Sequence, residues 1–130
     1  MNKPNDSLYP PDWFKIAKKD WQRIKIMLKE EDAEAAGYFL QQSLEKYLKA
    51  FLLEKGWKLK KIHELDTLLD EAVKYNPNLE SFRDLCERVA GYYFIERYPA
   101  LVEAGLSCEE IERDVTEAEK FIKSLLLKNQ

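Results

Sequence analysis

The sequence predicts an all-α protein, an up-and-down antiparallel bundle of four to five helices. Apolar residues recur at helical spacing along nearly the whole chain, and no segment alternates apolar and polar residues as a half-buried strand does. Capping and turn residues divide the periodic stretches with mostly short links. A chain of 130 residues with 45% hydrophobic content is long enough for one core. We therefore expect a polar leader over residues 1–11 and a single domain over residues 12–128.

The first two helices are predicted from their inner residues and their termini. Pro10-Pro11 precedes the first helix, which should run to about Lys29. Asp32 is suited to cap the second helix, expected over Ala33–Lys55, and Gly56 can end it in a left-handed conformation. The inner residues of the first helix are Trp13, Ile16, Ala17, Trp21, Ile24 and Leu28.

Three further helices follow a basic connector over residues 57–62. Asn76-Pro77-Asn78 should end the third helix, and Pro99 should stop the fourth. Gly91 weakens the fourth helix by about 1 kcal/mol relative to alanine. The last helix should begin at the capping box Ser107-Cys108-Glu109-Glu110. The expected inner residues of the third and fourth helices are Leu65, Leu68, Leu69 and Ala72, then Leu79, Phe82, Leu85, Cys86, Val89 and Ala90.

The second expected helix carries polar residues in two neighbouring rows. Gln41, Glu45 and Lys49 follow one another at four-residue steps, and Gln42 and Lys46 share that step beside them. One interpretation is a defined face that binds a ligand or a partner. The other is an exposed helix surface, stabilised by a few tenths of a kcal/mol per ion pair. The opposite, core-facing stripe consists of Leu40, Leu44, Tyr47, Leu48 and Phe51.

Composition narrows the classes of function. The net charge of −3 provides no global basic field for nucleic acid, so any RNA contact should be local. Cys86, Cys108 and the single histidine, His63, are too few and too far apart for a zinc site, so we expect no metal and no cofactor. The chain has no apolar run of eighteen residues and no signal-peptide pattern at its start. We expect a soluble cytoplasmic protein with no membrane partner, and Cys86 in its core.

Three motifs taken together resemble the HEPN family of small helical bundles. They are the helix Phe39-x-x-Gln42-x-x-Glu45-Lys46-x-x-Lys49-Ala50, His63 with the leucines that follow it, and the corner Arg97-Tyr98-Pro99. Their order and approximate spacing match the family pattern, and the resemblance covers roughly Asp12 to Leu127. It implies a bundle that usually forms homodimers. It also implies a partner role for a minimal nucleotidyltransferase, in toxin-antitoxin or stress-response systems.

Some members of that family are metal-independent ribonucleases, and this sequence departs from their motif. The motif has an Arg followed, after four to six residues, by a His. Counted from Arg88 or from Arg97, the histidine position holds Tyr93, Phe94 or Ile95, or else Val102, Glu103 or Ala104. RNA cleavage without a metal needs a base with a near-neutral pKa, and His is the side chain that has one unperturbed. We therefore expect a non-catalytic protein without catalytic residues.

Seven residues are candidates for binding a nucleotide, RNA or a protein partner. Arg97 could grip a phosphate while Tyr98 stacks on a base, or Arg97 could instead pair with Glu45 inside the bundle. His63 could have a functional role or only form hydrogen bonds at a helix end. Two other functions stay open: a ribonuclease that uses His63 or a Tyr, and a purely structural interaction module. The candidates are Gln42, Glu45, Lys46, Lys49, His63, Arg97 and Tyr98.

Overall fold

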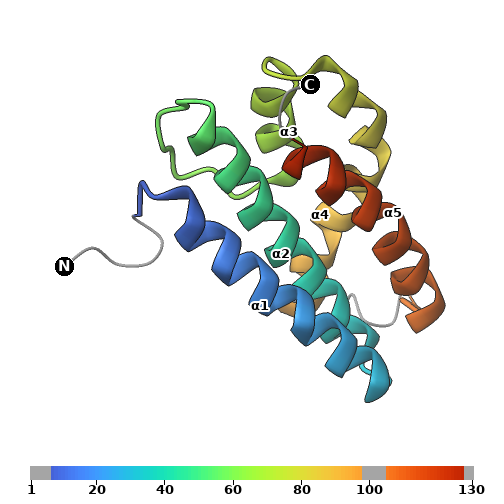
Figure 1. The fold of residues 1–130 in the computed structure, drawn as a ribbon. Coiled ribbons are helices and arrows are strands. Elements are labelled where there is room, and N and C mark those ends of the chain that lie inside the picture. The colour runs from blue at the N-terminus through green and yellow to red at the C-terminus, as the bar shows by residue number, and fades with distance from the viewer. Residues whose placement is uncertain (1–6, 98–104, 128–130) are drawn as a thin grey trace.

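The chain folds into a bundle of five α-helices and one 3-10 helix in a computed structural model, which describes residues 7–97 and 105–127, without the side chains of 93–97 (Figure 1). Successive long helices run in opposite directions. The described part contains no strand, so the predicted all-α class is confirmed. The elements are α1 (Pro10–Lys29), α2 (Ala33–Glu54), α3 (Leu65–Val73), the 3-10 helix η2 (Pro77–Phe82), α4 (Arg83–Arg97) and α5 (Cys108–Leu126).

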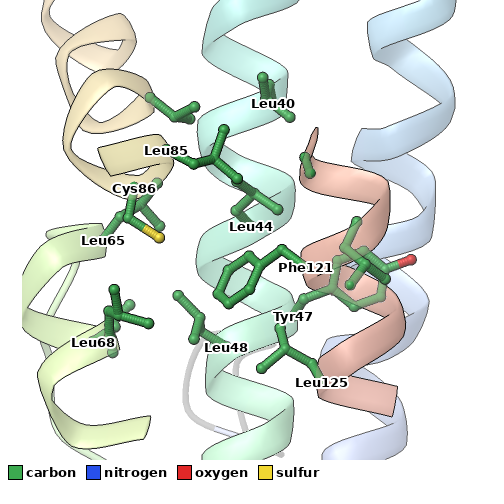
Figure 2. Packing of buried hydrophobic residues seen from close by; sticks show 14 of the residues in the cluster. Leu40, Leu44, Tyr47, Leu48, Leu65, Leu68, Leu85, Cys86, Phe121 and Leu125 are labelled. Atoms are coloured by element: carbon green, nitrogen blue, oxygen red, sulfur yellow. The ribbon is translucent and has the colours of Figure 1, made fainter. Parts of the chain in front are cut away.

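Helix α2 is the central element of the bundle. It contacts α1, α3, α4 and α5, whereas α1 packs chiefly on α2. Figure 2 shows its leucines between side chains of α3 and α4 on one side and of α5 on the other. This confirms the predicted core-facing stripe, in which Leu40, Leu44 and Leu48 are fully buried. Because neighbours surround α2 on several sides, even its polar residues have little access to water.

The predicted helix ends are set by local hydrogen bonds and backbone conformation. The Asp32 carboxylate accepts from the Ala35 backbone N–H at 3.1 Å, and the Ser107 hydroxyl accepts from the Glu110 N–H at 3.2 Å. Gly56 has φ +87°, in the left-handed region that favours glycine. The starts of α2 and α5 and the end of α2 therefore follow from the sequence. Helix α1 begins at Pro10, inside the segment expected as a leader.

The prediction of one continuous fourth helix starting at Leu79 is wrong. Residues Pro77–Phe82 form a 3-10 helix instead, and α4 begins only at Arg83. The Asn76 side chain accepts from the Asn78 N–H at 3.2 Å and holds the chain in a tight turn at Pro77. Leu79 is still fully buried, because a three-residue period places it on the same side as Phe82. Phe82 in turn packs on Phe121 with ring centroids 4.9 Å apart.

Helix α2 comes close to α4 and α5 at Gly37. A β-carbon there would lie 3.1 Å from Cγ of Tyr92 and 3.2 Å from Cδ1 of Ile111. The absence of a side chain at Gly37 is therefore what allows these three helices to meet. Nearby in α4, Cys86 is fully buried as predicted, and burial raises the pKa of its thiol to about 12. No helix in the described ranges is long and apolar enough to cross a membrane.

Candidate functional site

The first row of polar residues on α2 is buried. Gln41, Glu45 and Lys49 are 3%, 5% and 3% exposed, so the interpretation as an exposed helix surface is wrong for this row. The second row, Gln42 and Lys46, is only partly buried. Burying a carboxylate and an ammonium group is unfavourable unless each finds a partner. The contacts of these residues therefore explain how the fold tolerates them.

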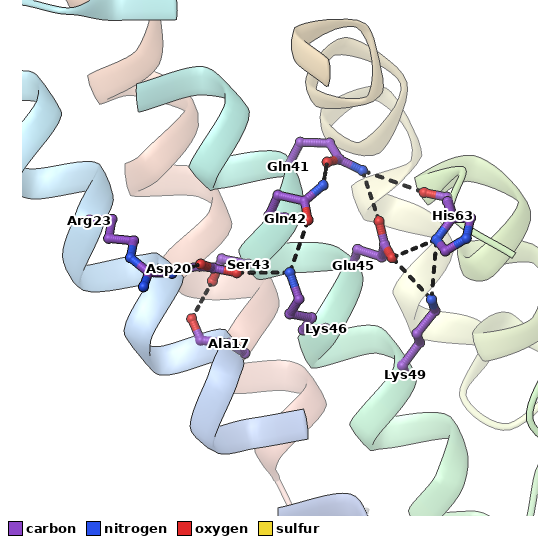
Figure 3. Close-up of polar contacts among 10 residues, drawn as sticks. All are labelled: Ala17, Asp20, Arg23, Gln41, Gln42, Ser43, Glu45, Lys46, Lys49 and His63. Atoms are coloured by element: carbon purple, nitrogen blue, oxygen red, sulfur yellow. Dashed lines mark hydrogen bonds and ion pairs between the residues drawn. The ribbon is translucent and has the colours of Figure 1, made fainter. Parts of the chain in front are cut away.

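The Glu45 carboxylate is the centre of a group that we name the Glu45 cluster: Gln41, Glu45, Lys49 and His63 (Figure 3). The Lys49 ammonium donates to Oε2 of Glu45 at 3.0 Å, and Nδ1 of His63 lies 3.0 Å from the same oxygen. The Gln41 amide donates to Oε1 at 3.2 Å and also to the His63 carbonyl oxygen at 3.4 Å. The cluster thus attaches the connector to α2. Lys49 also lies 5.2 Å from the centroid of the Trp13 ring, a cation-π contact.

A second set of hydrogen bonds extends this cluster to α1. The Gln42 amide donates to the Gln41 side-chain oxygen at 2.6 Å, and the Lys46 ammonium donates to the Gln42 oxygen at 2.9 Å. Lys46 also pairs with Asp20 on α1 at 2.9 Å, and Asp20 accepts from Arg23 at 2.7 Å. Figure 3 shows this continuous chain of contacts from α1 to the connector. All the predicted polar residues of α2 belong to one network.

Asp20 is a member that the sequence analysis missed. The buried residues of α1 are Trp13, Ala17, Asp20 and Ile24, so Asp20 occupies a core position in the apolar stripe of α1. A carboxylate at such a position needs a buried cation from a neighbouring helix. That irregularity in the stripe was the available signal, and Lys46 was the matching cation.

His63 keeps one ring nitrogen for contacts outside the protein network. The Glu45 carboxylate accepts hydrogen bonds only, so the contact at 3.0 Å places the proton on Nδ1. Lys49 lies farther from Nδ1, at 3.5 Å, and already donates to Glu45. In the neutral imidazole Nε2 is then an acceptor, and the side chain is 67% exposed. The His63 ring bonds to Glu45 of α2. It does not cap α3, whose N-cap residue is Glu64.

These groups border a pocket of about 780 Å³, which we name the α2 pocket. Ligand sites in proteins commonly have this size. The sequence analysis did not anticipate that α1, α3 and α4 contribute to it. Its lining comprises Trp13, Tyr38, Gln41, Gln42, Glu45, Lys46, Lys49, His63, Glu64, Leu65, Asp66, Ala90 and Gly91.

Gly91 lines the pocket at an exposed position of α4. A β-carbon placed there would have no neighbour within 4 Å, in contrast to Gly37. Glycine inside a helix is destabilising by about 0.5–1 kcal/mol relative to alanine. Close packing against the described helices therefore does not explain Gly91, and the described residues leave space beside it at the pocket.

The two remaining candidates are not placed by the structure. Arg97 is the last residue of α4, but its side chain lies outside the described part of the chain, as does all of Tyr98. The phosphate contact and the pairing with Glu45 both stay predictions. In the described ranges, no three His, Cys, Asp or Glu side chains are grouped as metal ligands.

The comparison with family models gives a match that spans nearly the whole chain. The model of the HEPN domain matches residues 11–129. The chain belongs to the HEPN family. No curated protein and no solved structure gives a significant match. The resemblance predicted from the three sequence motifs is thereby confirmed.

In this HEPN chain, Arg88 is engaged in a second polar group, the Asp114 cluster of Arg88, Tyr92, Asp114 and Glu117. The Arg88 guanidinium contacts the Asp114 carboxylate at 3.1 Å and the Glu117 carboxylate at 3.0 Å. The Tyr92 hydroxyl donates to Asp114 at 2.5 Å. Burial and the neighbouring Asp114 carboxylate raise the pKa of Tyr92 well above its usual value. A base that stays protonated at neutral pH cannot replace the missing histidine.

Proposed function

We propose that this HEPN domain is a non-catalytic module that binds a nucleotide or an RNA end in the α2 pocket. The HEPN family is known for nucleotide and RNA binding and for roles in toxin-antitoxin systems. The observation that carries the proposal is the pocket itself. It combines two side-chain amides, Gln41 and Gln42, with an accessible imidazole at His63 and apolar walls. This mixture suits a ligand with both a flat apolar surface and polar edges.

Gly91 provides a second, independent observation in favour of a binding role. The residue weakens α4 yet meets no described neighbour, so its benefit does not come from packing. Functional sites are where proteins commonly depart from the residue that stability favours. An open wall beside Gln41 and His63 is what a bound ligand would need.

The charges of the described pocket residues disfavour catalysis. Cleavage of RNA builds negative charge on the phosphorane, and enzymes stabilise it with positive groups held ready at the site. The two pocket lysines have other partners, because Lys46 pairs with Asp20 and Lys49 pairs with Glu45. The Arg-to-His spacing of the ribonuclease members is also missing from the sequence.

A second candidate, a metal-independent ribonuclease, is favoured by one contact. The Glu45 carboxylate orients the His63 ring through Nδ1, and this arrangement prepares the other nitrogen to act as a general base. Incubation of the pure protein with labelled RNA, beside His63→Ala, separates the two functions. Cleavage by the wild type that disappears in the variant would replace our proposal with the enzyme.

The proposed biological role is that of a homodimer which partners a minimal nucleotidyltransferase in the cytoplasm, in a toxin-antitoxin or stress-response system. Membership of the HEPN family supports this role. Co-expression with nucleotidyltransferases encoded beside the gene should yield a stable complex. Sedimentation of the purified protein should give twice the mass of the chain. A monomer that enters no such complex would contradict the role and leave the pocket proposal intact.

The pocket is tested by amide chemical shifts on titration with ATP and then with a short RNA. We expect shifts around Gln41 and His63. They should be lost in Gly91→Leu, which fills the space beside α4, and kept in the matched control Glu87→Leu, which is also exposed on α4 but does not line the pocket. Shifts that persist in Gly91→Leu would place binding elsewhere. No shifts with either ligand would leave the protein as a structural interaction module.

A further inference from the structure

We propose that the α2 pocket recognises the nucleoside part of its ligand and leaves the phosphates outside. This inference rests on the proposed function and narrows it to a class of ligand. The first observation concerns Lys46 and Lys49, the two pocket lysines that could contact a phosphate. Each has a carboxylate within 3.0 Å, and Lys49 is buried together with its partner, Glu45. A phosphate would have to compete with a charge pair that the fold has already formed.

The charges around the pocket also oppose a polyanion. Its described lining holds three carboxylates, Glu45, Glu64 and Asp66, against two ammonium groups, Lys46 and Lys49. Glu64 and Asp66 are exposed, and neither has a lysine or arginine among its described ion pairs. The described lining therefore disfavours additional negative charge.

The start of α3 does not compensate for these carboxylates. A helix N-terminus attracts anions through its unpaired N–H groups and its dipole. Here Glu64 occupies the N-cap position and Asp66 lies in the first turn, so this end of α3 already has two negative groups. A phosphate in the pocket would lie close to both of them.

The accessible polar groups instead favour a ligand that donates hydrogen bonds. In the neutral imidazole of His63, Nε2 is an acceptor because the proton is on Nδ1, facing Glu45. The carboxylates of Glu64 and Asp66 accept as well. Leu65, Ala90 and the open position at Gly91 provide apolar wall. An aminated heterocycle, such as adenine, offers N–H donors on its edge and a flat apolar face.

The test compares four ligands by calorimetry: adenosine, purine riboside, AMP and ATP. Purine riboside lacks only the exocyclic amine of adenosine. We expect ATP to bind about 2- to 5-fold more weakly than adenosine at low salt, as for like charges at a protein surface. That difference should shrink when salt is raised, because the repulsion is screened. Adenosine should bind about 2- to 10-fold more tightly than purine riboside, as for one net hydrogen bond.

Two variants assign these differences to residues. His63→Ala should remove the preference for adenosine over purine riboside. The double variant Glu64→Gln, Asp66→Asn should bring ATP affinity up to that of adenosine. Asp84→Asn is the matched control, since Asp84 is exposed on α4 and does not line the pocket. All three changes lie at exposed positions, so folding should be retained.

The outcomes separate this inference from the proposed function. Adenosine at least as tight as ATP, with the variant effects above, supports both. ATP tenfold tighter than adenosine overturns the inference and keeps nucleotide binding. No binding of any of the four ligands, together with no shifts on RNA titration, overturns both.

Discussion

The Glu45 and Asp114 clusters use similar chemistry for different ends. In each cluster, a nearly buried carboxylate accepts hydrogen bonds from one cation and from one further side chain. The further side chain is His63 for Glu45 and Tyr92 for Asp114. Asp114 on α5 binds Arg88 and Tyr92 on α4, so its contacts join two helices. Two partners of Glu45, Gln41 and Lys49, are on α2 itself.

The two clusters therefore contribute differently to the contacts between helices. Removing Asp114 would take away its contacts with Arg88 and Tyr92 and leave the Arg88–Glu117 pair as the polar contact described between α4 and α5. The Glu45 cluster joins α2 to His63, which follows the connector, and to Trp13 of α1, and it leaves an exposed imidazole beside a pocket. The Glu45 cluster is fully paired and borders a pocket, and this combination suits a binding site.

The largest expected effect tests the burial of the Glu45 pair. Glu45→Ala should lower the free energy of unfolding by about 3–5 kcal/mol, because it leaves the buried Lys49 ammonium without its carboxylate. The double variant Glu45→Leu, Lys49→Met should recover most of this loss, since apolar residues of similar volume replace the pair. Urea unfolding followed by circular dichroism measures both. A double variant as unstable as the single one would show that the pair itself holds the bundle together.

The Asp114 cluster should respond differently to the same treatment. Asp114→Ala should lower the free energy of unfolding by about 1–3 kcal/mol, because the buried Tyr92 hydroxyl loses its acceptor. Combined with Tyr92→Phe, the losses should be non-additive by at least about 0.5 kcal/mol. Glu117→Ala, at the exposed edge of the cluster, should stay within about 0.5 kcal/mol of wild type. Additive losses would contradict a direct bond between α4 and α5 at this point.

Two glycines sharpen the comparison, one beside each cluster. Gly37→Ala should lower the free energy of unfolding by up to about 2 kcal/mol, because the added methyl meets Tyr92 and this outweighs the gain in helix propensity. Gly91→Ala should raise it by about 0.5–1 kcal/mol, since the methyl enters open space. Thermal unfolding of the two variants measures the contrast. Loss of stability in Gly91→Ala would mean that the pocket wall is packed.

The smallest effect concerns Glu71, a carboxylate of α3 that accepts hydrogen bonds from Trp57 and Lys60 of the connector. Hydrogen bonds from Lys74, Lys60 and Trp57 lower its pKa from 4.5 to about 2. The stability that these contacts give is present above pH 4.5 and is lost as the pH falls toward 2. Glu71→Gln should flatten this part of the pH profile, by less than about 1 kcal/mol. Equal acid profiles for the two proteins would show that Glu71 contributes nothing.

The spacing of polar residues along the sequence alone predicted much of the candidate site. The four-residue steps of Gln41, Glu45 and Lys49 predicted one face of a helix, and the structure brings them together. The sequence left open whether that face was exposed to solvent, because the same spacing also stabilises exposed helices. Burial by α1 and the connector decided it. The partnership with His63 joins residues 18 positions apart, which no helical period predicts.

The sequence by itself determined most of the helices, several of their end points and the family, but not the 3-10 helix over Pro77–Phe82. The features that the sequence determined depend on residues only a few positions apart, so they can be predicted without the tertiary structure. They are the helical periodicity, the side-chain caps Asp32 and Ser107, and the left-handed conformation of Gly56. Only the tertiary structure decided that Asp20 would neutralise Lys46 and that an open wall would remain at Gly91. Those outcomes depend on which helix faces pack together, and contacts between distant segments set the charge and shape of the pocket.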